Sequence, residues 1–183
     1  MSAEAHVTPI WKKQKLFVAL FLIGIGGWFF YDGVIGYPKS NVRWTAHEKF
    51  KAEERLTQWP DFAKSQGWDE HQPHKFLTQT DIYGQFAFGG LAALLGLTTL
   101  IYWAGQKGRV VKTDAEAVFT PAGTRVPFSA ITGVGKKKWD AKGLATVRFQ
   151  IDGRKGEFLL DDYKFDRDAT HKILAEIEEH LPA

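Results

Sequence analysis

Two long stretches free of charged side chains constrain this chain more than any other feature. The first runs from Leu16 to Tyr31, and the second runs from Tyr83 to Ala104 with Gln85 as its one strongly polar residue. The hydrocarbon core of a bilayer requires about 20 apolar residues of helix, a length that both stretches reach when their flanks enter the interface. The sequence therefore predicts a membrane hairpin of two transmembrane α-helices.

The remainder of the sequence is as charged as a soluble protein, and the mean hydropathy of −0.25 hides this division. We predict a cytoplasmic N-terminus with the first transmembrane helix at 1–37 and a partly helical extracytoplasmic loop at 38–82. The second transmembrane helix is expected at 83–104 and a soluble cytoplasmic domain at 105–183. The first stretch is also typical of a cleaved signal peptide. Bulky aromatic residues follow it where such a peptide needs small ones, so we expect a retained anchor.

Basic residues flank the two stretches on what should be the same side of the membrane: Lys12, Lys13 and Lys15 before the first, and Lys107, Arg109 and Lys112 after the second. The loop between them carries equal numbers of basic and acidic residues. Because positively charged flanks stay in the cytoplasm, we expect both termini on the cytoplasmic side of a bacterial inner membrane.

Small residues recur in both stretches at spacings near one helical turn, and they are candidates for helix packing: Gly24, Gly26 and Gly27 in the first, and Gly89, Ala93 and Gly96 in the second. Such residues let two helices approach closely, although glycine is also simply common in membrane helices. Neither stretch contains a charge or a histidine. That absence argues against transport through this chain alone and against haem ligation.

The loop combines helix signals with aromatic residues. Thr45 and Glu48 form a capping box, which predicts a helix from there to about Gln58, and Pro60 could open a second short helix. Candidate outer-loop contacts, with the bilayer or with another protein, are Trp44, Trp59, Phe62 and Trp68.

Metal and cofactor chemistry has little support. His71 and His74 lie beside acidic residues, but Pro73 between them prevents a regular helix from aligning them, so a polar turn is the better interpretation. The absence of cysteine excludes disulfides, thiolate metal sites and a cysteine nucleophile. We therefore predict no metal and no cofactor.

The C-terminal third changes to short alternating stretches, which predict an antiparallel sheet with strands near 109–113, 115–120, 124–127, 131–139, 144–151 and 155–160. Turns are expected at 121–123, 140–143 and 152–154. The last stretch predicts an amphipathic helix capped by Asp166 or Asp168. The fold class is thus a membrane helical hairpin followed by an α+β domain.

This order of strands and one terminal helix resembles the bacterial pleckstrin-homology-like (PH-like) domains that are often attached to membrane helices. The resemblance covers about 110–182, and its most distinctive positions are Ile131, Trp139, Gly143 and the DDYKFD stretch. It implies a PH-like antiparallel sheet or barrel capped by the helix. It also implies a binding role toward lipid, peptide or protein, because the architecture serves all three.

Lys136, Lys137, Lys138 and Trp139 are the candidate contact with anionic lipid or with a partner. Strand alternation would point Lys136 and Lys138 one way and Lys137 and Trp139 the other, which favours an edge strand protected by lysines.

No nucleophile with an evident base is present, so an enzyme is not expected. We predict a non-enzymatic membrane-anchored binding or scaffolding module, or an accessory subunit of a larger membrane complex. A transmembrane sensor and an anionic-lipid-binding domain are the alternatives. The expected partners are membrane lipids and other membrane subunits or further copies of the chain, and not nucleic acid.

Overall fold

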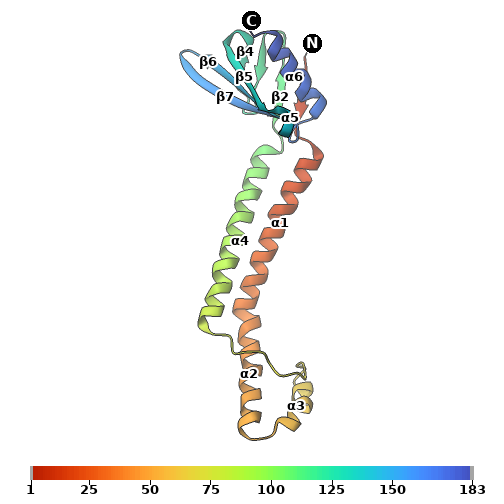
Figure 1. The fold of residues 1–183 in the computed structure, drawn as a ribbon, viewed down its shortest axis with the longest axis vertical. Coiled ribbons are helices and arrows are strands. Elements are labelled where there is room, and N and C mark those ends of the chain that lie inside the picture. The colour runs from red at the N-terminus through yellow and green to blue at the C-terminus, as the bar shows by residue number, and fades with distance from the viewer. Residues whose placement is uncertain (1, 182–183) are drawn as a thin grey trace. The chain divides into compact units, whose positions relative to one another are not determined.

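A computed structural model describes residues 2–181 of the chain, and the chain forms two compact units. One unit joins the residues up to Phe17 to those from Thr99 onward, and the other is Val18–Thr98. The helices are α1 (Pro9–Tyr31), α2 (Tyr37–Ala52), α3 (Trp59–Ser65), α4 (Gln79–Gln106), α5 (Trp139–Lys142) and α6 (Arg167–Glu179) (Figure 1). The strands are β1 (Glu4–His6), β2 (Val110–Thr113), β3 (Ala117–Phe119), β4 (Arg125–Pro127), β5 (Ile131–Lys138), β6 (Leu144–Ile151) and β7 (Arg154–Asp161).

In the helical unit, α1 and α4 pack against each other in antiparallel directions through small residues. A Cβ atom on Gly96 would lie 2.8 Å from Cγ1 of Ile23, and one on Gly26 would lie 2.9 Å from the carbonyl oxygen of Gly89. Ala93 also contacts Gly26, with 3.0 Å between its Cβ and the built atom. No larger side chain fits at these glycines, so the helix backbones lie in direct contact.

Gly24 and Gly27 do not take part in this contact, although we expected them to. A Cβ atom built on either residue meets no neighbour within 4 Å. Successive residues of a helix are rotated by about 100°, so both lie on other faces than Gly26. Of the three glycines in α1, Gly26 is therefore the one that lies in the contact.

The helix that contains α1 continues without a break into α2, so that it spans Pro9–Ala52. The expected start at Thr45 was wrong, because Thr45 lies in the interior of α2, which begins at Tyr37. In a helix interior the backbone N–H bonds to the carbonyl four residues earlier, so no cap is needed there. A π-helical segment, Asp32–Gly36, joins the two parts. Such a wider turn rearranges the backbone hydrogen bonds directly before Pro38, which has no N–H to donate.

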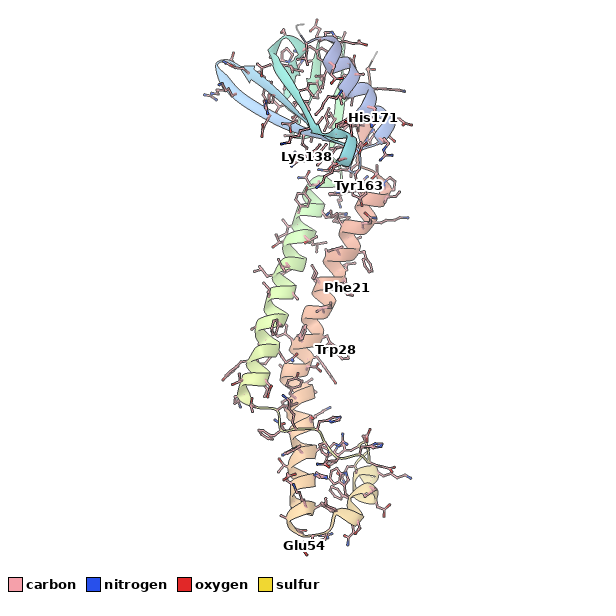
Figure 2. The ribbon with its side chains drawn as sticks, viewed as in Figure 1. Phe21, Trp28, Glu54, Lys138, Tyr163 and His171 are labelled. Atoms are coloured by element: carbon pink, nitrogen blue, oxygen red, sulfur yellow. The ribbon has the colours of Figure 1, made fainter. Side chains whose placement is uncertain are left out.

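Pro9–Ala52 and Gln79–Gln106 are long and apolar enough to cross a membrane. The outward side chains of α1 and α4 are largely hydrophobic, as the exposed Phe21 and Trp28 illustrate (Figure 2). Exposed aromatic and aliphatic side chains of this number are unusual for a protein surface in water.

The other unit contains two antiparallel sheets, with strand orders β1-β2-β3-β4 and β5-β6-β7. The six predicted strands and the final helix are confirmed, with ends shifted by at most two residues. Asp166 caps α6, because its Oδ1 accepts a hydrogen bond of 3.0 Å from the backbone N–H of Ala169. The sheets do not close into a barrel. The turn expected at 140–143 is instead the short helix α5, which ends at Gly143 with a φ of 65°.

Strand β1 was not predicted. It joins the residues that precede α1 to the sheet that follows α4. It pairs with β2 through Glu4 and Lys112, Ala5 and Val111, and His6 and Val110. Ala5, Val7 and Trp11 are buried in the core of the sheets and α6. The domain therefore contains residues from both sides of the helical segment (Figure 1).

The glycine contact between α1 and α4 yields the first prediction. Gly96→Val should destabilise the helix pair by about 1–3 kcal/mol, because its side chain would overlap Ile23 and the backbone of Ala19. Gly24→Val is the matched control, since it makes the same chemical change in open space. Thermal unfolding of both variants in the same detergent measures the difference. Equal loss of stability in the two variants would contradict the observed packing.

Candidate functional site

The C-terminal unit contains a basic cavity of about 730 Å³ where α4 gives way to β2. We call it the junction pocket. Its lining residues are Glu4, Ala104, Gly105, Lys107, Gly108, Arg109, Val110, Lys112, Phe119, Thr120, Pro121, Ala122 and Gly123. Three of them are basic and one is acidic, so the pocket suits an anion.

Arg109 holds the two walls of the junction pocket together. Its Nε donates a hydrogen bond of 3.1 Å to the carbonyl of Gly105 at the end of α4. Its Nη1 donates one of 2.8 Å to the carbonyl of Pro121 in the turn between β3 and β4. That turn requires Gly123, whose φ is 87°. Arg109 is thus partly engaged in structure.

Lys107 and Lys112 are the more available cations of the junction pocket, and both are exposed. The ammonium of Lys107 lies 4.5 Å from the ring centre of Trp103, and that of Lys112 lies 5.2 Å from the ring centre of Phe119. Neither lysine is neutralised by these rings, which attract the cation without removing its charge. The arrangement can therefore bind a compact polyanion by charge.

The DDYKFD stretch attaches the first turns of α1 and the last turns of α4 to the sheets. Lys164 donates a hydrogen bond of 2.7 Å to Oε1 of Gln106. Its ammonium also lies 5.3 Å from the ring centre of Trp11 and 5.1 Å from that of Phe165. Burial among these rings disfavours the charged form and lowers the pKa of Lys164.

The same stretch makes three further connections. Oδ1 of Asp161 accepts hydrogen bonds of 3.0 Å from the N–H groups of Tyr163 and Lys164, which fixes the turn. Phe165 is buried and bridges to Val7. The hydroxyl of Tyr163 donates to the side chain of Gln14 on α1. The stretch that carried the family resemblance thus has a structural role.

Beside this stretch, Trp139, Gly143, Asp162 and His171 come together around a second cavity of about 550 Å³. Asp162 is only 10% exposed, and its Oδ2 lies 3.1 Å from Nε2 of His171 and 3.3 Å from Nε of Arg167. A Cβ atom on Gly143 would lie 1.7 Å from Oδ1 of Asp162, so only glycine fits. The ion pair with Arg167 and the contact with His171 connect α6 to the turn after β7 and leave Asp162 fully engaged.

The candidate contact at 136–139 lies at the end of β5, and its side chains differ in availability. Lys136 forms an ion pair of 2.9 Å with Glu178 of α6. Lys137 and Lys138 are exposed, and Lys138 is visible at the end of the strand (Figure 2). A bulge between Gly135 and Lys138 breaks the regular alternation. Trp139 lies beyond the strand, in α5, where its ring centre lies 4.8 Å from that of His171 with the two planes tilted by 48°.

Four aromatic residues of the helical unit form a small cluster, namely Phe50, Trp59, Phe62 and Trp68. Trp59 is 3% exposed, and its ring contacts those of His47, Phe50, Phe62 and Trp68. The proposed outer contact through Trp59 is therefore corrected, because α3 packs this side chain against α2. Phe62 and Trp68 are half-buried at the edge of the cluster, and Trp44 is half-buried on α2.

The two histidines of the loop, His71 and His74, are both exposed. His71 Nδ1 lies 2.7 Å from Oδ1 of Asp69, and hydrogen bonds from His71 lower the pKa of that carboxyl group. Within residues 2–181, no group of three or more histidines, cysteines or carboxylates is placed to hold a metal ion.

Comparisons of this chain with family models, with curated proteins and with solved structures find no match.

The docking of α1 on the sheets yields a second prediction. Trp11→Ala should destabilise the C-terminal domain by about 3–5 kcal/mol, because Trp11 is buried in its core although it lies in the first helix. Ile10→Ala is the control, since Ile10 is 65% exposed. Limited proteolysis of the full chain at increasing denaturant concentration, scored by cleavage within residues 105–183, reports the free energy of unfolding of the domain. The packing is refuted if both variants resist the protease equally.

Proposed function

We propose that this protein is a non-enzymatic, membrane-anchored binding module of the bacterial inner membrane. In this proposal α1 and α4 cross the bilayer as a hairpin, and the PH-like domain lies on the cytoplasmic side. The antiparallel order of two sheets of four and three strands followed by α6 supports the PH-like assignment.

One observation carries the proposed topology, which is the pairing of β1 with β2. Strand β1 precedes the first candidate span and β2 follows the second, and the two strands are hydrogen-bonded neighbours. Strands separated by a bilayer cannot pair. If the spans are inserted, the residues before α1 and after α4 must therefore lie on the same side, and the loop between them on the other.

Cysteine labelling tests this topology, because the native chain contains no cysteine. Single variants Glu4→Cys, Lys155→Cys and Gln66→Cys place thiols at exposed positions. In spheroplasts, a membrane-impermeant maleimide should label the Gln66→Cys variant, and the other two should react only after the membrane is opened. Labelling of the Glu4→Cys and Lys155→Cys variants from opposite sides would refute the proposal.

The junction pocket favours a ligand class for the module, namely the phosphate-bearing headgroup of an anionic lipid. It directly follows the end of α4, so that Lys107 and Lys112 would lie at headgroup level. Each basic side chain close to an anionic surface contributes on the order of 1 kcal/mol. Glu4 is the one acidic residue that lines the pocket, so it alone would repel the headgroup phosphate.

Thermal unfolding in detergent tests this ligand. Short-chain phosphatidylglycerol should raise Tm by about 2–4 °C for each kcal/mol of linked binding free energy, whereas phosphatidylcholine should not. The difference between the lipids should vanish in the double variant Lys107→Ala/Lys112→Ala and persist in Lys155→Ala, which removes a lysine from β7. An unchanged difference in the double variant would exclude the pocket.

A further inference from the structure

Strand β5 differs from the other outer strands of the two sheets. On β1, the carbonyl of His6 already accepts from Asp166 N, and the N–H of Thr8 donates to Lys164 O. Strand β4 has only three residues, and β7 carries charges of both signs. Strand β5 has eight residues, ends in three lysines and pairs with β6 along one edge.

The other edge of β5 has no strand partner, because β5 is the outer strand of its sheet. In the view of Figure 1, β6 lies to one side of β5, and β2 and α6 lie to the other. Among residues 2–181, no backbone hydrogen bond leaves β5 toward α6, and the ion pair between Lys136 and Glu178 crosses that side. The N–H and C=O groups of an unpaired edge are the usual template for an added strand.

Two glycines in the middle of β5 leave space where a side chain would lie, although the residues from Gly133 to Gly135 are half-buried. A Cβ atom on Gly133 would meet no atom within 4 Å, and the nearest atom to one on Gly135 lies at 3.8 Å. Glycine inside a strand weakens it and commonly marks a place where another backbone approaches. The two glycines directly precede the lysines, so a strand paired with Thr132–Gly135 would extend alongside the positive charge.

The charge of β5 selects which chain can pair with it. Lys136, Lys137 and Lys138 are all exposed, and Lys136 is paired with Glu178. Lysines on an edge repel a basic strand and discourage an apolar one, which protects the edge against aggregation. They do not exclude an acidic strand, whose carboxylates would be attracted to all three.

We propose that the open edge of β5 receives an extended, acidic segment of a partner protein as an additional strand. Its backbone pairs with Thr132–Gly135, and its carboxylates bind Lys137 and Lys138 and replace Glu178 on Lys136. This inference rests on the proposed role as a binding module and names the chemistry of the partner. It requires neither the junction pocket nor a particular topology.

Fluorescence anisotropy on the full chain in detergent tests the proposal with a labelled octapeptide of alternating glutamate and valine. Binding should be saturable and should weaken about ten-fold in the double variant Lys137→Glu/Lys138→Glu. Arg154→Glu/Lys155→Glu is the matched control, because it also reverses two adjacent exposed cations, at the start of β7. An analogue with N-methyl groups on alternate residues, which cannot donate to β5, should also bind about ten-fold more weakly.

Three results would overturn the proposal: no saturable binding, equal affinity of the N-methylated analogue, or equal losses in Lys137→Glu/Lys138→Glu and in the control Arg154→Glu/Lys155→Glu. The second would show attraction by charge without strand pairing. Thermal unfolding of each variant confirms that the domain is intact. Failure here with a retained response to phosphatidylglycerol would leave the headgroup site standing, so the two proposals fail separately.

Discussion

The pairing of β1 with β2 is the constraint on which the rest of the structure depends. It joins residues that are more than a hundred positions apart, as the bond of 3.0 Å from Ala3 N to Thr113 Oγ1 illustrates. It also brings the start of α1 and the end of α4 into one unit, where Trp11 packs against Tyr102. Without β1 the sheet would expose the edge of β2 and the apolar side of Val111. The helical segment is therefore an insertion within a domain, and the domain cannot be complete until that segment has been synthesised.

Much of this fold could be predicted because its signals are local. The alternation in β6 and β7, the turn glycines and the cap of α6 all act over a few residues, and these elements lie where they were expected. Strand β1 could not be found in this way, since three residues carry no detectable alternation and their partner is remote in sequence. The capping box at Thr45 misled for a related reason. It indicates a helix locally, but it cannot report that a helix already arrives from α1.

For the candidate sites, the sequence shows which residues are present but not which of them the fold brings together. Lys107, Arg109 and Lys112 were conspicuous in the sequence, but only as a flank that sets orientation. Their joint role required the turn around Pro121 and Gly123, which tertiary structure brings beside them. For the tryptophans, the sequence did not show which side chains would be buried. Trp59 is the centre of a buried cluster and Trp139 is half-buried next to His171, although both stand in charged surroundings in the sequence.

The two cationic regions of the domain differ in shape, and shape decides which anion each one suits. The junction pocket is concave, with its lysines and Arg109 around one cavity, so it can surround a compact polyanion. The end of β5 is linear, with its lysines in sequence along an edge that also offers backbone groups. A headgroup cannot use that backbone, and an extended acidic chain can. The two surfaces are therefore suited to anions of different shape, one compact and one extended.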